Sequence, residues 1–212
     1  TSVEDASNNA INAANASFTA ADILAPTTTF SPANSATAVA VASDITLTFN
    51  EAVRLINNSA LDDSNVDALI TLKENNSSGA DIAFNATING GKTVITINPN
   101  SNLSSTQVVY VAIGATVEDA SNNAINAANV SFTAADIVAP TMIITSAEVS
   151  DGATSNDSTL AMTFTSSEAT SNFVVGDISV SGGALSSFNA TSATVYTATF
   201  TPSSDGAKTI DV

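Results

Sequence analysis

The chain has 212 residues, with 20 acidic and four basic side chains, a net charge of −16, and neither cysteine nor histidine. These absences exclude disulfides, thiolate metal sites, the usual zinc ligand and a Ser-His-Asp triad. The acidity argues against binding nucleic acid or anionic lipid, which needs clustered Lys and Arg, and no apolar run approaches the ~20 residues of a membrane-spanning helix.

The opening segment of the chain recurs further along at a constant offset of 114 residues, from Val3 to Val117. Residues 3–26 read VEDASNNAINAANASFTAADILAP, and residues 117–140 read VEDASNNAINAANVSFTAADIVAP. Such identity indicates recent duplication of a unit made of a polar loop, a short strand and an Ala-Pro-Thr linker. The proline holds the linker extended. We therefore interpret residues 1–25 as the last loop and strand of a preceding domain.

Residues 26–139 have the pattern of one complete domain of short β-strands. Apolar residues recur at every second position, and clusters of Asn, Ser and Gly separate these stripes. The stripes are Ile45, Leu47 and Phe49; Ile70 and Leu72; Ile95 and Ile97; Val109, Val111 and Ile113; and Val130 with Phe132. No stretch has a helical period. Strands of this length and spacing are typical of a β-sandwich.

Residues 140–212 form a second, divergent copy of the same plan. Thr163-Phe164 followed by Glu168 corresponds to Thr48-Phe49 followed by Glu51. One face is expected to carry Leu160, Met162 and Phe164, and another Tyr196, Ala198 and Phe200. This stretch contains no counterpart of the VEDASNN loop and the strand that follows it. We expect it to fold as a sandwich that lacks its last strand.

Three motifs, in this order, resemble bacterial immunoglobulin-like domains of large surface adhesins and S-layer-associated proteins. They are Ala-Pro-Thr at each domain start, Thr-Phe-x-Glu-Ala-Val at residues 48–53, and Val-x-Asp-Ala-x-Asn-Asn before the last strand. The resemblance implies an all-β fold of tandem immunoglobulin-like, Greek-key β-sandwiches in an extended array. It also implies an extracellular, cell-surface location. Family members often have Gly-Asn where this chain has Ser121-Asn122-Asn123, so we expect an Asn in the left-handed conformation there.

Six carboxylates are expected to gather at the joints between domains. In such a sandwich, the loop after the second strand and the loop before the last strand lie at the end where the chain enters. The first joint would hold four of these residues and the second joint two: Asp22, Glu51, Glu118 and Asp119, then Asp136 and Glu168. Converging carboxylates repel one another unless a cation lies among them, and Ca²⁺ takes six to eight oxygen ligands. The alternative is that the aspartates of the linkers cap turns and the glutamates are solvated.

A second calcium pattern lies within the complete domain. Asp63, Asn65 and Asp67, with Glu74 further on, match an EF-hand loop except that Ala68 replaces the required glycine. An EF-hand loop needs flanking helices, whereas the residues after Asp67 alternate as in a strand. The strand interpretation is therefore favoured.

The chain is not expected to be an enzyme. Without His or Cys it would need paired carboxylates in an apolar pocket, and without Trp it has little to stack on a sugar ring. Near-identical repeats and stiff joints favour a structural spacer or filament segment, whose partners are neighbouring copies of the repeat, in cis or as a homopolymer. The alternative is a ligand- or carbohydrate-binding adhesin module. It would need exposed aromatic residues in loops, but Tyr110 and Tyr196 fall within predicted strands.

The end of the sequence and its beginning complement each other. Residues 209–212 read TIDV, and with residues 1–23 after them they match YVAIGATVEDASNN and its continuation in the complete domain. We expect either one 212-residue period of a longer array, or a subunit whose residues 1–24 complete a neighbour by strand addition. Both versions predict that Ser17–Ala21 pairs with a strand from outside this chain.

Overall fold

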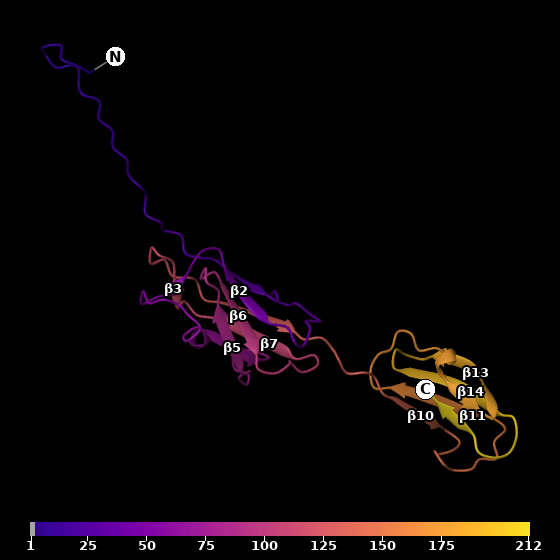
Figure 1. The fold of residues 1–212 in the computed structure, drawn as a ribbon. Helices are drawn as coiled ribbons and strands as arrows, with labels where there is room; N and C mark the ends of the chain where they lie inside the picture. The colour runs from indigo at the N-terminus through magenta and orange to yellow at the C-terminus, as the bar shows by residue number, and fades with distance from the viewer. Residues whose placement is uncertain (1–2) are drawn as a thin grey trace. The chain divides into compact units, whose positions relative to one another are not determined.

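The computed structural model describes residues 3–212 and divides the chain into two units, Thr1–Ile137 and Val138–Val212 (Figure 1). Both are built from antiparallel strands. The only helices among the described residues are two short 3₁₀ turns, η1 (Asp67–Leu69) and η2 (Val175–Asp177), and neither has the length of a membrane crossing. The all-β prediction is confirmed. The division between the units falls two residues before the domain boundary that the linker motif predicts.

The first sheet of unit 1 has four strands in the order β1-β2-β6-β5. They are β1 (Thr28–Ser31), β2 (Ile45–Phe49), β6 (Val94–Pro99) and β5 (Phe84–Ile88). The central strands β2 and β6 show the predicted alternation, with Leu47 paired to Ile95 and both side chains fully buried. Alternation places one face of a sheet on the core, and each buried Leu or Ile contributes roughly 1.5–3 kcal/mol relative to exposure.

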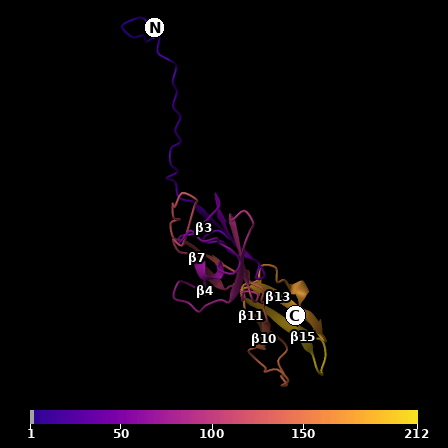
Figure 2. The same cartoon turned by 60° about the vertical axis from the view of Figure 1, so that its left-hand side comes forward.

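The second sheet of unit 1 has the order β4-β7-β9, and a short ladder of two strands extends the sandwich. Its strands are β4 (Ile70–Glu74), β7 (Val108–Ile113) and β9 (Ala128–Thr133), and the short ladder joins β3 (Arg54–Leu55) to β8 (Val117–Glu118). Figure 2 shows β4 and β7 side by side. The chain passes between the two sheets from β2 to β4, from β4 to β5 and from β6 to β7, which is a Greek-key arrangement.

The outer edge of β5 is covered by two aspartates that precede β4, Asp63 from the loop and Asp67 from the turn η1. The Ala86 amide donates to Asp67 Oδ1 at 2.6 Å, and the Ile88 amide donates to Asp63 Oδ1 at 2.8 Å. These bonds satisfy backbone donors that point away from β6. The EF-hand interpretation of residues 63–74 is therefore wrong, because two of its would-be ligands bind the sheet and Glu74 ends strand β4.

Unit 2 repeats the plan of unit 1 with one position unfilled. Its large sheet has the order β10-β11-β14-β13, from β10 (Met142–Ser146), β11 (Leu160–Ser166), β14 (Val195–Pro202) and β13 (Gly183–Ala190). Its small sheet pairs β12 (Ser179–Ser181) with β15 (Thr209–Asp211), as β4 pairs with β7 in unit 1. Within the described chain, no strand takes the place beside β15 that β9 takes beside β7.

The core of unit 2 is smaller and rests more on aromatic contacts. Its buried apolar residues are Met162, Phe164, Ile178, Tyr196, Ala198 and Phe200. Phe173 packs edge-on against Tyr196 with ring centroids 4.9 Å apart, and against Phe188 at 5.7 Å. Such contacts add about 0.5–1.5 kcal/mol per pair beyond burial. Phe173 and Phe188 are only partly buried, so this core is less closed than that of unit 1.

Residues 3–25 join neither of these sheets. Residues 3–11 fold into a loop closed by a bridge between Glu4 and Ala10 and by a hydrogen bond from the Ile11 amide to the Val3 carbonyl at 2.9 Å. Residues 12–25 form an unpaired, extended stretch (Figure 1). Phe18 within it has 94% of its surface exposed. Among the described residues no strand pairs with Ser17–Ala21, and pairing with an outside strand stays a prediction.

Candidate metal centre

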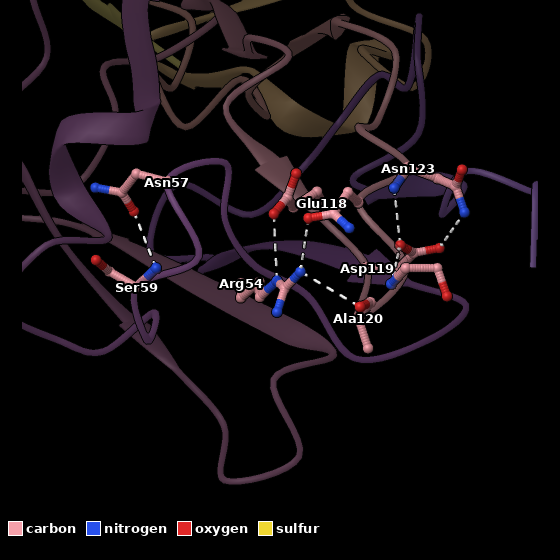
Figure 3. Close-up of polar contacts among 9 residues, drawn as sticks. Arg54, Asn57, Ser59, Glu118, Asp119, Ala120 and Asn123 are labelled. Atoms are coloured by element: carbon pink, nitrogen blue, oxygen red, sulfur yellow. Dashed lines mark hydrogen bonds and ion pairs between the residues drawn. The ribbon is translucent and has the colours of Figure 1, made fainter.

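The loop before β9 is organised around the carboxylate of Asp119. Asp119 Oδ1 accepts hydrogen bonds from the Ser121 amide at 2.7 Å and the Asn123 amide at 2.9 Å. The Asn123 side-chain amide donates to Asp119 Oδ2 at 2.8 Å (Figure 3). An aspartate that binds amides two and four residues ahead closes a tight turn. Asn122 completes the turn with φ of 69°, which confirms the predicted left-handed asparagine.

The surroundings of Asp119 hold its carboxyl group in the charged form. Burial of this side chain opposes ionisation. The hydrogen bonds from Asn123 and Ser121 and the charge of Arg54 outweigh that burial, and the net result is a pKa below the usual aspartate value. Asp119 is therefore an anion at neutral pH, buried to 2% exposure and anchored by its own loop. An anchored anion is a suitable metal ligand because little motion remains to be lost on binding.

Asp119 lies beside two further carboxylates from other parts of unit 1. Oxygens of Asp22, Glu51 and Asp119 all lie within 4.8 Å of one another. Asp22 comes from the linker before β1, and its backbone carbonyl accepts a hydrogen bond from the Asn123 side chain at 3.2 Å. Glu51 follows β2, and its neighbour Asn50 accepts a bond from the Thr27 amide at 2.6 Å. The structure thus brings together three of the four residues predicted for the first joint.

These three carboxylates have a spacing that fits a shared hard cation. Two oxygens on opposite sides of Ca²⁺, each at about 2.4 Å, are about 4.8 Å apart, so oxygens that lie within 4.8 Å of one another can share one ion. The cluster supplies three carboxylates, and loop carbonyls and water would have to complete the six to eight ligands. Among residues 3–212 this is the one group of three or more potential ligands that meets this spacing.

Glu118 has a different partner from its neighbour Asp119. Consecutive residues at the end of β8 point to opposite sides, so Glu118 turns toward β3 and forms an ion pair with Arg54 Nε at 3.2 Å. Arg54 also donates to the Ala120 carbonyl at 3.3 Å (Figure 3). A further bond joins Arg54 to Asn122 Oδ1 at 3.1 Å. Glu118 is buried, and the guanidinium balances its charge. Sequence reasoning placed Glu118 with the metal ligands and missed the role of Arg54.

The two residues predicted for the second joint belong to different units. Asp136, in unit 1, accepts a hydrogen bond from the Ser105 hydroxyl at 2.7 Å. Glu168, in unit 2, follows β11, and its amide donates to the Ser166 hydroxyl at 3.4 Å. Their predicted approach to each other stays a prediction.

A shallow groove lies elsewhere on unit 1, between η1, β4 and β5. It has a volume of about 410 Å³ and includes Lys73 and Asp81, which form an ion pair of 2.6 Å across it. Phe84 is its single aromatic residue. Both aspartates that line the groove are engaged, since Asp67 accepts the Ala86 amide at 2.6 Å and Asp81 pairs with Lys73.

Comparison with protein families follows the division into two units. Residues 22–134 match a model described as a bacterial Ig-like domain, and residues 136–212 match a second model with the same description. The first match alone spans more than half of the chain. The chain belongs to the bacterial Ig-like domain family. The resemblance inferred from the Ala-Pro-Thr, Thr-Phe-x-Glu-Ala-Val and Val-x-Asp-Ala-x-Asn-Asn motifs is thereby confirmed.

Two solved structures are similar to parts of this bacterial Ig-like chain. CopC from Methylosinus trichosporium OB3b is 16% identical, with 52% of this chain and 92% of that chain covered and a TM-score of 0.35. The N-terminal part of the bacterial S-layer protein SbsC is 11% identical, with 66% of this chain and 41% of that chain covered and a TM-score of 0.34. A comparison with curated protein sequences gave no significant match. At such low structural scores neither likeness carries a functional argument.

Proposed function

We propose that this chain is a structural segment of a long extracellular surface protein, in which tandem sandwiches act as spacers. The observation that carries the proposal is the succession of two bacterial Ig-like domains together with a segment repeated almost without change. In a tandem array each repeat contacts only its neighbours, so the number of repeats determines the length of the protein and no binding pocket is required. The net charge of −16 suits a protein that must stay soluble in many copies.

The distribution of aromatic side chains supports a spacer over a binding module. Tyr196 is buried at 4% exposure, and Phe173 and Phe188 pack on it inside unit 2. Among the described residues, the one strongly exposed aromatic side chain is Phe18, in the unpaired segment 12–25. A carbohydrate-binding surface needs aromatic faces available on loops, and the loops of both sandwiches present Asn, Ser, Gly and Ala instead.

Calcium enters this proposal as a cross-link between linker and domain. The carboxylate of Asp22 belongs to the entering linker, whereas Glu51 and Asp119 belong to the body of the sandwich. An ion held by all three would tie the linker to the domain and restrict its motion. Without the ion, three carboxylates at this spacing repel one another, and the linker is released. The proposed spacer would then be stiff in calcium and loose without it.

Surface labelling tests the proposed location and role. Antibodies raised against the chain should label intact cells of the source organism, and external protease should remove the label without lysis. Permeabilised cells serve as the control for total antigen. Label that appears only after permeabilisation would contradict a surface location. A glycan array on the purified chain separates the roles, since tight and selective binding to one glycan would favour the adhesin module.

A further inference from the structure

The last strand of unit 1 is paired along both of its edges. On one edge β9 pairs with β7. On the other edge it is bonded to residues 34–39, which follow β1 in the sequence, and the bridge between Val39 and Ala134 shows that the two segments run parallel. The stretch of chain that follows the first strand of the sandwich is therefore bonded directly to its last strand.

Among the described residues, five hydrogen bonds join residues 34–39 to β9 and the two residues after it. Four are between backbone groups: the amides of Ser35, Thr133, Val39 and Ala135 donate to the carbonyls of Ser131, Ala36, Thr133 and Val39 at 2.7, 2.8, 3.2 and 2.7 Å. The fifth joins the Ser131 amide to Asn34 Oδ1 at 3.0 Å. Val39 packs against the core and Ala134 is 2% exposed, so apolar side chains border the bonds.

The parallel direction of this pairing determines how it responds to a pull on the chain. In a parallel pair the start of one segment and the end of the other lie at opposite ends. The chain enters unit 1 before residues 34–39 and leaves it after β9, so tension on the two linkers pulls the paired segments in opposite directions along their length. All five bonds run across that direction and carry the load together. The pull reaches residues 34–39 through β1, which has four residues and pairs on one edge.

We propose that the pairing of residues 34–39 with β9 is the load-bearing element of unit 1, the contact that keeps the sandwich folded when the protein is stretched. The inference deepens the proposed function and rests on it, because a spacer held at a cell surface carries tension along its length. Bonds that break in the step that limits unfolding under force determine its rate. Bonds that are still intact in that step contribute to equilibrium stability and leave the unfolding rate unchanged.

A second edge contact in unit 1 provides a matched control. The Ile82 amide donates to the Leu72 carbonyl at 3.0 Å, at the edge of β4, and the side chains of Ile82 and Val39 both pack, partly buried, against the same core. The loop of residues 75–79 joins the two sides of this contact within the domain. Tension on the linkers therefore does not act between them, and the bond should stay intact until the sandwich has opened.

Single-molecule stretching of the full chain at constant force, held at its two ends, tests the proposal. The longer extension step belongs to unit 1, since its sandwich spans residues 28–135 and that of unit 2 spans residues 142–211. Val39→Pro removes one loaded amide, and unit 1 should unfold at least about fivefold faster under force. Ile82→Pro should lower stability against urea by a similar amount and leave the rate under force unchanged. Equal rates in the two variants would overturn the proposal.

A milder pair of variants covers the case in which a proline prevents folding. Asn34 and Asn76 are both exposed, and the side-chain oxygen of each accepts one backbone amide, at 3.0 and 2.9 Å. Asn34→Ala should speed the unfolding of unit 1 under force about fivefold, and Asn76→Ala should not. No difference between these two variants would also overturn the proposal. Such a failure leaves the surface label unchanged, so it is distinguishable from failure of the spacer role.

Discussion

The two copies of the repeated segment have nearly the same sequence and differ in structure in an instructive way. Their loops are alike: Asp5 binds the Ser7 and Asn9 amides at 2.9 Å each, and Asp119 binds the equivalent amides at 2.7 and 2.9 Å. Their strands are not alike. β9 is paired and buries Phe132, whereas residues 14–19 are unpaired and expose their phenylalanine.

The difference separates what is local from what is not. The loop forms in both places because the hydrogen bonds that shape it join residues of the loop itself, residues 3–11 in one copy and 117–125 in the other. An asparagine with positive φ completes the turn, Asn8 in one copy and Asn122 in the other. A strand has no such bonds of its own, since its amides and carbonyls are satisfied only by a neighbouring strand. The loop is encoded by its sequence alone, and the strand by its sequence together with an available edge.

Truncation of the two phenylalanines should give the largest contrast between the copies. Phe132→Ala empties a buried site, which we expect to destabilise unit 1 by about 3–5 kcal/mol. Phe18→Ala in the monomeric chain should leave the unfolding free energy unchanged, because that ring is exposed. Urea denaturation followed by circular dichroism measures both. Equal effects would mean that the opening segment is docked within its own chain.

Calcium should distinguish the two loops next. Asp119 shares a cluster with Asp22 and Glu51, and Asp5 belongs to no such cluster among the described residues. When the free calcium concentration is about 100 times the dissociation constant, an ion bound only by the folded state adds about 2.7 kcal/mol to the free energy of unfolding. NMR titration should therefore shift the amides of residues 119–123 and leave those of residues 5–9 in place.

The control for the calcium prediction is a pair of isosteric changes. Glu51→Gln should abolish the shifts, and Glu148→Gln, at a glutamate in unit 2, should not. Shifts of equal size in both loops would show nonspecific binding to an acidic surface.

Loss of the ion pair between Arg54 and Glu118 should have an effect of intermediate size on stability. Arg54→Met keeps much of the packing but leaves the carboxylate of Glu118, whose side chain is 5% exposed, without its counter-charge. Because Arg54 itself is partly exposed, we expect a loss of about 1–3 kcal/mol, below the 3–5 kcal/mol typical of a fully buried pair. Glu4→Gln, at the exposed twin of Glu118, should have no measurable effect on thermal unfolding. A stable Arg54→Met protein would contradict the importance of this pair.

The smallest expected effect is the change in loop stability with pH, and it should be the same in both loops. The pKa of Asp5 is lowered by the Asn9 side chain and by the Asn9 and Ser7 amides, and the pKa of Asp119 is lowered as well. Because the pKa is lower in the folded loop, ionisation of the aspartate stabilises the loop at a pH above the usual aspartate pKa of about 3.9. This contribution is lost as the pH falls through the lower pKa of the folded loop.

Carboxyl carbon shifts measured by NMR over an acid titration test this expectation. Both aspartates should titrate below the usual value, and the amides of Ser7 and Ser121 should move with them. An ordinary pKa for Asp5 beside a low one for Asp119 would show that the loop depends on the sandwich.

The strands were predictable from sequence because their cause is periodic. Ile45, Leu47 and Phe49 alternate with polar residues, and β2 spans them without a residue of difference. The alternation in Leu160, Met162 and Phe164 likewise predicts β11. The expectation that residues 140–212 lack a last strand rests on the absence of a counterpart of the VEDASNN loop within them, and it stays a prediction.

The short ladder of β3 and β8 was not predictable by the same reasoning. Strands of two residues have no period, and Arg54 and Glu118 are separated by more than 60 positions in the sequence. One signal was available: Arg54 is the only arginine in a chain with 20 acids, and a single guanidinium next to an apolar strand favours a buried partner. The side chains of consecutive residues point to opposite sides of a strand. This alternation could have indicated that Glu118 forms an ion pair whereas Asp119 is a candidate metal ligand.

The aspartates on the edge of β5 bear on how such a protein behaves at high density. A cell surface carrying many copies of one sandwich holds identical β-edges close together, the condition under which sheets merge and precipitate. In this chain the amides of Ala86 and Ile88 are already occupied by Asp67 and Asp63, so a colliding copy finds no free donors there. It meets two carboxylates instead. The protein can be crowded against itself at this edge without aggregating through it.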